Sequence, residues 1–184
     1  RLAEHLRSGG QGVVLTREPG GSPGAEELRS LLVEGEPDRW SPETEILLFT
    51  AARRDHMERT ILPALADGRT VICDRFVDST RAYQGSGPNR EQVEVLHQLM
   101  IARDPDLTLL IDIEPAEAAR RAFERAGGED RFERHGLDFQ HRLRAAFHMI
   151  AKAETDRVRV IDGRGTSDDV TARVLAAYRE HANV

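Results

Sequence analysis

The sequence predicts an α/β fold, in which a mostly parallel sheet is flanked by helices on both faces. Two observations lead to this class. Four short runs rich in β-branched and aliphatic residues are spread along the 184 residues, and segments of helical periodicity separate them. Strands that alternate with helices form parallel sheets covered on both faces. No repeat, low-complexity segment or linker interrupts the pattern, so we expect residues 1–184 to form a single domain.

The predicted strands are short apolar runs, as expected for strands buried in a parallel sheet. They lie at 13–16, 70–74, 107–112 and 158–162. The second of these runs straight into Asp74 and Arg75, two opposite charges that need partners if they are removed from water.

The predicted helices follow from apolar residues at helical spacing, such as Leu28, Leu31 and Leu32, or Ile46 and Phe49. Further helices are expected at 91–103, 115–126, 138–153 and 167–181. Pro115 suits a first helical position, and Ser167 followed by acidic residues is typical of an N-cap.

The opening stretch, "RLAEHLRSGGQG", has the pattern of the last turns of a helix with a glycine-rich stop. A helix in an α/β fold normally follows a strand. We therefore expect a strand and its loop to precede Arg1. The phosphate-cradling pattern GxxxxGK[ST] does not occur in the sequence.

Composition narrows the classes of function. The formal net charge of -6 argues against a nucleic-acid partner, which usually requires a basic face. No apolar run approaches the ~20 residues that span a bilayer, so we expect no membrane partner. Cys73 is the single cysteine and has no disulfide partner in the sequence, which fits a reducing compartment. We therefore expect a soluble cytoplasmic protein that binds small molecules.

The stretch "LTREPGGSPG", residues 15–24, follows the first predicted strand. Gly20 and Gly21 would let a ligand approach the backbone closely, because they lack side chains. Ligands of open α/β sheets bind outside the carboxyl ends of strands. A plain strand-to-helix turn is the alternative. Arg29, on the next helix, could clamp a phosphate or could be an ordinary solvated arginine.

Phe49 and Arg53 are four residues apart, so on a helix they project from the same face. A ring and a guanidinium placed in this way can hold a flat heteroaromatic ligand by stacking and hydrogen bonding. The ordinary alternative is a core phenylalanine beside a surface arginine.

The stretch "VICDRFVDSTRAYQG", residues 71–85, places Asp74 and Arg75 at a strand end. An acid there can order a magnesium-bound water, and an arginine can neutralise a phosphoryl group. An ion pair between the two is the alternative. A polar turn is expected to follow, in which Thr80, Tyr83 and Gln84 offer polar groups and an aromatic wall for a small molecule.

The stretch 124–136, "ERAGGEDRFERHG", interrupts a helical pattern and carries Arg125, Arg131 and Arg134 around a Gly-Gly pair. It could be a mobile lid that neutralises phosphate charge, or a solvated charged segment. The histidines show no metal-ligand spacing, and one cysteine excludes a zinc–thiolate site. Any metal is therefore expected to arrive with phosphates.

Taken together, these pieces resemble the bacterial thymidylate kinase family, P-loop nucleoside monophosphate kinases that phosphorylate dTMP with ATP. The resemblance rests on "LTREPGG", "LRSLL", "LLFTAAR", "PAL..GRTVICDRFVDSTRAYQG", "PDLTLLIDIEP" and "EDRFER", in family order. These pieces span residues from Val13 to about Arg144.

The resemblance implies a role for each matching residue. Phe49 would stack on thymine, Arg53 would hydrogen-bond a thymine carbonyl, and Thr80 would contact the base edge. The remaining substrate residues would be Glu18 and Pro19 in the monophosphate loop, Arg29 and Arg75 on the dTMP phosphate, Tyr83 beside the sugar, and Gln84.

Arg75, Asp74 and Arg131 are the predicted catalytic residues, and Asp74 would also lie on the Mg²⁺ side. Arg131, with Arg125 and Arg134, would close over ATP as lid arginines.

The resemblance also implies a five-stranded parallel sheet, a homodimer, and a role in dTTP biosynthesis with ATP and Mg²⁺. The family's P-loop and first strand would lie before Arg1, so we expect the complete protein to contain residues there. Two alternative functions stay open: a deoxynucleoside kinase, and a non-catalytic nucleotide-binding module if the P-loop is truly missing.

Overall fold

The structure is a computed structural model that describes residues 1–36, 38–124 and 136–182. These residues fall into two compact units. The N-terminal unit comprises Ala3–Asp104, and the C-terminal unit comprises residues 105–124 and 136–182 together with Arg1–Leu2. Each unit is described by itself.

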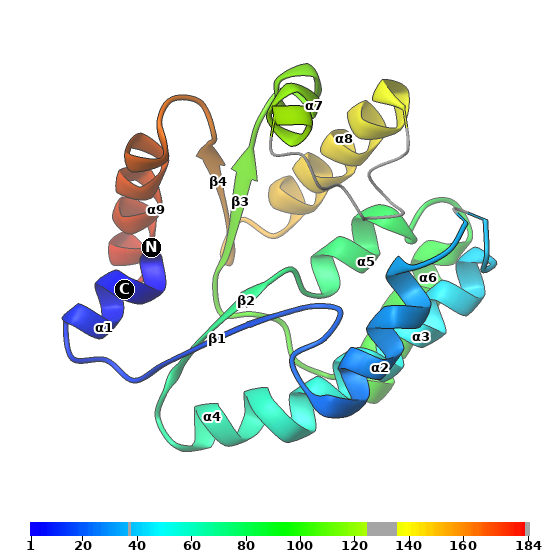
Figure 1. The fold of residues 1–184 in the computed structure, drawn as a ribbon. Coiled ribbons are helices and arrows are strands. Elements are labelled where there is room, and N and C mark those ends of the chain that lie inside the picture. The colour runs from blue at the N-terminus through cyan, green and yellow to red at the C-terminus, as the bar shows by residue number, and fades with distance from the viewer. Residues whose placement is uncertain (37, 125–135, 183–184) are drawn as a thin grey trace. The chain divides into compact units, whose positions relative to one another are not determined.

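The elements that precede residue 105 alternate helices with two strands (Figure 1). In chain order they are α1 (Leu2–Ser8), β1 (Val13–Arg17), α2 (Pro23–Val33), α3 (Pro42–His56), the π-helical turn η1 (Met57–Ile61), α4 (Leu62–Ala66), β2 (Thr70–Asp74), α5 (Val77–Tyr83) and α6 (Asn89–Met100).

Strands β1 and β2 lie side by side as a parallel pair, with Val13 opposite Thr70 and Arg17 opposite Asp74. The carboxyl ends of both strands therefore meet at one edge. One further hydrogen bond follows the ladder, from the Glu18 backbone N–H to the Asp74 carbonyl at 2.9 Å. This bond holds the two loops that leave the sheet next to each other.

Helix α3 begins where local chemistry favours a start. The Ser41 hydroxyl accepts a hydrogen bond from the Thr44 backbone N–H, and Pro42 occupies the first helical position. The helical run continues through η1 into α4. Met57 and Ile61 of η1 form a small buried cluster with Ile101, and Phe76 packs against that cluster. Apolar burial thus fixes the helix that carries Arg53.

The C-terminal unit contains β3 (Thr108–Asp112), α7 (Pro115–Glu124), α8 (Leu137–Ala153), β4 (Val158–Asp162) and α9 (Ser167–Ala182). Strands β3 and β4 also pair in parallel, and their terminal aspartates, Asp112 and Asp162, lie opposite each other. No described helix in either unit has the length and apolar character needed to cross a bilayer.

The α/β class with parallel strands is confirmed, and all four predicted strands form. The predicted helices also form, with ends that differ by a few residues; the last two residues predicted for the 115–126 helix lie outside the described part of the chain. The five-stranded sheet stays a prediction, because the described strands form two parallel pairs.

The polar turn expected after Arg75 is wrong, because residues 77–83 form helix α5. The buried side chains of Val77 and Thr80 are three residues apart and lie on one face of this helix. Polar residues at the other positions concealed this helical period in the sequence. Because α5 forms, Thr80 is held on a helix and not in a turn.

Candidate active site

A cavity of about 230 Å³ lies at the carboxyl ends of β1 and β2, within the N-terminal unit. Its lining contains ten of the residues singled out in the sequence: Glu18, Pro19, Arg29, Phe49, Arg53, Asp74, Arg75, Thr80, Tyr83 and Gln84. Their elements are far apart in the chain, from the loop after β1 to helix α5. The position agrees with the rule that α/β sheets bind ligands beyond their carboxyl strand ends.

Arg53 is held by hydrogen bonds to two other residues of the cavity lining. It is only 3% exposed, so the alternative of a surface arginine is wrong. Its Nε donates to Glu18 Oε2 at 2.7 Å, and its Nη2 donates to Thr80 Oγ1 at 3.0 Å. The guanidinium also lies over the ring of Phe76, 5.1 Å from the ring centroid. Because Glu18 is buried as well, the two charges compensate each other away from water.

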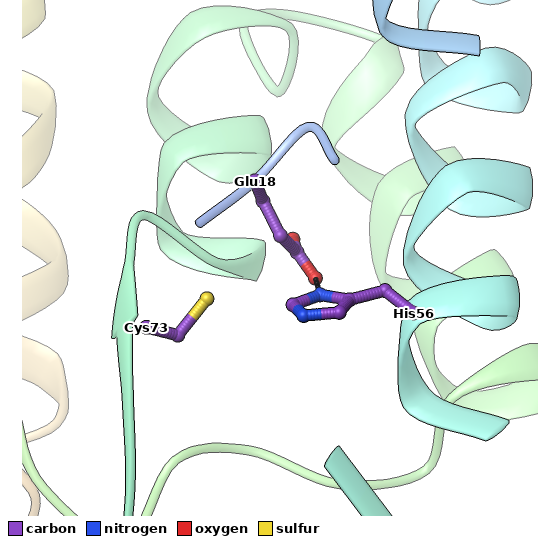
Figure 2. Close-up of side chains that lie close together, drawn as sticks. All are labelled: Glu18, His56 and Cys73. Atoms are coloured by element: carbon purple, nitrogen blue, oxygen red, sulfur yellow. Dashed lines mark hydrogen bonds and ion pairs between the residues drawn. The ribbon is translucent and has the colours of Figure 1, made fainter. Parts of the chain in front are cut away.

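His56 contacts the other oxygen of the Glu18 carboxylate, as the dashed line in Figure 2 marks. It is fully buried at the last residue of α3. Its Nδ1 lies 3.1 Å from Glu18 Oε1, and its Nε2 lies 2.8 Å from the Thr16 hydroxyl. Each oxygen of the Glu18 carboxylate therefore has its own partner, Arg53 for Oε2 and His56 for Oε1.

Cys73 lies close to this pair on strand β2, as Figure 2 also shows. Its thiol donates to the Arg75 carbonyl oxygen at 3.0 Å. Burial raises the pKa of the Cys73 thiol far above its ordinary value, and the nearby Glu18 carboxylate raises it further. The side chain is therefore a neutral thiol at physiological pH.

Arg75 follows β2 in a left-handed backbone conformation, with φ 66°. This conformation costs a non-glycine residue about 1 kcal/mol, and such strain is concentrated at functional sites. The Arg75 Nη1 donates to the Tyr83 hydroxyl at 3.2 Å, and the guanidinium lies 5.5 Å from the ring centroid of Tyr83. Asp74 is exposed at the strand end beside it.

The glycine-rich loop after β1 is anchored at several points. Arg29 Nη1 donates to the Pro19 carbonyl at 2.7 Å, and the Thr60 hydroxyl donates to the Gly21 carbonyl at 2.7 Å. The Gly21 backbone N–H donates to Glu26 Oε1 at 2.9 Å. This last bond lowers the pKa of Glu26, as does the nearby guanidinium of Arg17.

Gly21 is needed at its position for two reasons. Its φ is +86°, and a Cβ there would overlap Thr16 Oγ1 and His56 Nε2. The glycine thus lies directly against the side chains that support Glu18.

The cavity also contains residues that the sequence did not single out: Arg17, Val33, Phe76 and Ser79. Position alone could have indicated Arg17 and Phe76, because each borders a strand-end motif. Ser79 precedes Thr80 on the same helix, and Val33 carries no chemical signal. Gln84 has a buried partner that was also missed, since its Nε2 donates to Glu45 Oε2 at 3.1 Å.

The charge of the lining favours an anionic ligand. Among the described residues, four arginines and two carboxylates, Glu18 and Asp74, line the cavity, and Glu18 is already neutralised by Arg53. Arginines bind phosphate oxygens with strong, oriented hydrogen bonds. Aromatic rings and small hydroxyls in the same cavity suit a flat base with polar edges.

The predicted lid, residues 124–136, lies almost entirely outside the described part of the chain. Arg125, Arg131 and Arg134 all belong to the undescribed stretch, so their predicted role stays a prediction.

A cavity whose lining suits phosphate and a flat ring, at the carboxyl ends of parallel strands, is typical of nucleotide-binding proteins of the α/β class. The family model for thymidylate kinase matches residues 1–174. The chain belongs to the thymidylate kinase family.

Similar proteins agree with this membership. The chain is 63% identical over 178 residues to the thymidylate kinase of Dinoroseobacter shibae, covering 96% of this chain and 86% of the relative. It is 60% identical over 184 residues to the thymidylate kinase of Ruegeria pomeroyi, covering 99% and 87%. The crystal structure of thymidylate kinase from Ehrlichia chaffeensis is similar with a TM-score of 0.74 and 35% identity, covering 97% of this chain and 87% of that one.

Proposed function

We propose that this protein transfers the γ-phosphoryl group of ATP to dTMP, giving dTDP, a step towards dTTP, and that the cavity of the N-terminal unit is its dTMP site. Membership of the family supports the reaction. The observation that carries the site is the convergence of ten predicted residues on one cavity.

The base end of the site is built around Arg53. Glu18 and Thr80 engage its Nε and Nη2, and within the described residues no hydrogen bond uses Nη1. This nitrogen is the donor we assign to a thymine carbonyl. Phe49 would supply the stacking surface, and Thr80 would contact the base edge. Because Arg53 is held by two partners, it would meet the base with little loss of conformational freedom.

The phosphate end is assigned to Arg29 and Arg75. Both line the cavity, and arginine is suited to bidentate binding of phosphate oxygens. Tyr83 lies under the Arg75 guanidinium and would form the wall beside the sugar. The two arginines would fix the acceptor oxygens for in-line attack.

Chemistry at the acceptor does not require a strong base. The second pKa of a phosphate monoester is about 6, so dTMP already carries an anionic oxygen near neutral pH. Phosphoryl transfer then depends on positioning and charge neutralisation. Arg75 would supply part of that neutralisation, and the lid arginines Arg125, Arg131 and Arg134 would supply the part on ATP.

The exposed carboxylate of Asp74 has the hard oxygen donors that Mg²⁺ prefers, and it lies at the strand end beside Arg75. We assign Asp74 to the Mg²⁺ side of the site, holding the ion through a water molecule. Bound Mg²⁺ would neutralise charge on the phosphates of ATP.

The two alternative functions are not favoured. A deoxynucleoside kinase needs a general base for a neutral hydroxyl, whereas this cavity gathers arginines suited to a phosphate acceptor. A non-catalytic module would not explain why relatives at 63% and 60% identity are thymidylate kinases.

The site is tested by Arg53→Ala in the full-length protein, with dTDP formation as the readout. The KM for dTMP should rise about 10- to 100-fold, as expected for losing hydrogen bonds from a charged donor. The KM for ATP should change little. Arg54→Ala is the matched control, because the neighbouring Arg54 points to Glu58 and the Met100 carbonyl. Equal increases in both KM values would contradict the assigned role of Arg53.

We also infer a homodimer, formed through helices α3 and α6 of the N-terminal unit. These helices pack together and expose large apolar side chains, namely Leu47, Val95, Leu99 and Met100. Val95 and Leu99 share a helix face, since they are four residues apart. Light scattering should give twice the mass of the chain, and a single-chain mass would exclude the dimer.

A cytoplasmic location is inferred from the cysteine content. Cys73, the single cysteine of the sequence, is a free thiol, which suits a reducing compartment.

A further inference from the structure

Behind the cavity lies a chain of polar contacts that no assigned role explains. It runs from Thr16 on β1 through His56 at the end of α3 to Glu18, and from Glu18 to Arg53. His56 does not line the cavity, and its side chain is fully buried. A buried histidine with a partner for each ring nitrogen is held in one orientation.

The donor atoms of Glu18, His56 and Cys73 lie within 4.8 Å of one another, which raises the question of a metal site. The bonds already present argue against this use. His56 is engaged at both nitrogens, Glu18 at both oxygens, and the Cys73 thiol donates to a backbone carbonyl. The neighbouring positive charge of Arg53 would also repel a cation. The group is therefore a satisfied hydrogen-bond network.

The chemistry of each partner fixes the direction of the bonds. The Glu18 carboxylate is ionised beside Arg53 and can only accept, so His56 Nδ1 carries the proton and donates to Oε1. In the neutral imidazole Nε2 is then an acceptor, and the Thr16 hydroxyl donates to it. The network thus selects one tautomer of His56.

The bond from His56 to Glu18 fixes the orientation of the Glu18 carboxylate toward Arg53. A carboxylate held only at Oε2 can rotate about its terminal bond, which would let the Arg53 guanidinium shift. With Oε1 held by His56 Nδ1 at 3.1 Å, Oε2 stays 2.7 Å from Arg53 Nε. Arg53 lies three residues before His56 on α3, so both bonds to Glu18 start from one helix face.

We propose that His56 is a positioning residue for dTMP recognition, which acts through Glu18 to fix the Arg53 guanidinium. Thr16 supports it by holding the imidazole ring at Nε2, while Glu18 fixes the tautomer. This inference rests on the proposed function, because it requires Arg53 to contact the base.

The experiment compares His56→Leu with His56→Asn in the full-length protein, by calorimetric titration with dTMP. Leucine fills the space without a donor, whereas the asparagine side-chain nitrogen can occupy the place of Nδ1 and keep the bond to Glu18. His56→Leu should weaken dTMP binding about tenfold, the size of one lost hydrogen bond to a charged group. His56→Asn should bind dTMP close to the unaltered protein, and the KM for ATP should change little in both variants.

His97→Leu is the matched control for removing a buried histidine. His97 on α6 is equally buried and lies outside the cavity lining. Its loss should lower stability while dTMP affinity stays unchanged. If His97→Leu weakened dTMP as much as His56→Leu, a general structural effect would replace the proposal. If His56→Leu does not fold, Thr16→Val, which removes only the hydroxyl behind His56, should give a smaller loss of dTMP affinity with the same selectivity over ATP.

A double-mutant cycle separates this inference from the proposed function. If His56 acts through Arg53, His56→Leu should cause no further loss of dTMP affinity in an Arg53→Ala background. Additive losses would overturn the positioning role while leaving Arg53 as a dTMP ligand. Unchanged dTMP binding in Arg53→Ala alone would instead overturn the assigned role of Arg53.

Discussion

Three strands in the described part of the protein end in aspartate, and the surroundings of these three aspartates differ. Asp112 and Asp162 end the paired strands of the C-terminal unit, and Asp74 ends β2 in the N-terminal unit. The Asp112 carboxylate is bound at both oxygens by Arg144, at 2.7 and 2.9 Å, and Asp162 is bound by Arg164. These arginines lower the pKa of both aspartates. The sequence "CDR" at Asp74 instead introduces an arginine that lies against Tyr83 in a cavity.

The comparison teaches that an acid at a strand end does not by itself indicate a site. In the C-terminal unit the acids form ion pairs that solvent reaches, with Arg144 34% exposed. In the N-terminal unit the decisive ion pair is Glu18 with Arg53, whose side chains are 5% and 3% exposed. Solvent-exposed pairs contribute little to stability, whereas removing one partner of a buried pair is strongly destabilising.

The largest expected effect is therefore at the buried pair. Glu18→Ala leaves the Arg53 charge buried without compensation and should lower the free energy of unfolding by about 3–5 kcal/mol. Asp112→Ala, its counterpart in the C-terminal unit, should cost about 1 kcal/mol. Urea unfolding of the two variants measures both losses. Equal losses would mean that burial does not distinguish the two regions.

The elements of the fold that could be predicted are those that a local sequence pattern determines, and the element that was missed depends on long-range packing. Strands β2 and β4 were predicted with the bounds that the structure shows, because short apolar runs between polar residues are a local pattern. Helix α5 was missed, because Asp78, Ser79 and Thr80 disguise a helix whose buried face only the tertiary structure reveals.

The residues of the candidate site were predicted mainly from the resemblance to a family, and ten of them line one cavity in the structure. The supporting residues could not be found in this way. His56 contacts Glu18 across 38 positions, and Gln84 contacts Glu45 across 39. Periodicity reports which face of a helix is apolar, but it carries no information on which distant polar groups meet in the interior. Phe76 borders a strand-end motif, but its place under Arg53 depends on the packing of η1, which the sequence does not reveal.

A smaller effect is expected from the glycine that lies against this network. Gly21→Ala should be destabilising because its φ of +86° disfavours a side chain and because the new Cβ overlaps Thr16 and His56. Gly10→Ala is the matched control, since Gly10 has a φ of +83° and nothing within 4 Å of a Cβ. Overpacking should make Gly21→Ala about 1–3 kcal/mol worse than Gly10→Ala in urea unfolding. Equal losses would show that backbone strain alone sets the cost.

The smallest expected effect is the pH dependence of the glycine-rich loop. The Gly21 backbone N–H and Arg17 lower the pKa of Glu26 below its ordinary 4.5. A depressed folded-state pKa stabilises the protein above the unfolded-state pKa, and this contribution is lost as the pH falls through the folded-state value. Glu26→Gln should therefore be less stable than the unaltered protein at pH 6, by less than about 1 kcal/mol because the Glu26 and Arg17 side chains are half exposed.

As the pH falls below 4.5, the difference in stability between the two proteins should shrink. Protonation removes the negative charge of Glu26, which glutamine also lacks. Asp112→Asn provides the comparison in the C-terminal unit, where the lowered pKa starts from an ordinary value of 3.8. Its stability difference should therefore begin to shrink at a lower pH than that of Glu26→Gln. Thermal unfolding midpoints between about pH 3 and 6 measure both curves. A difference for Glu26→Gln that stays constant over this range would show that the loop is held by bonds other than those to the Glu26 carboxylate.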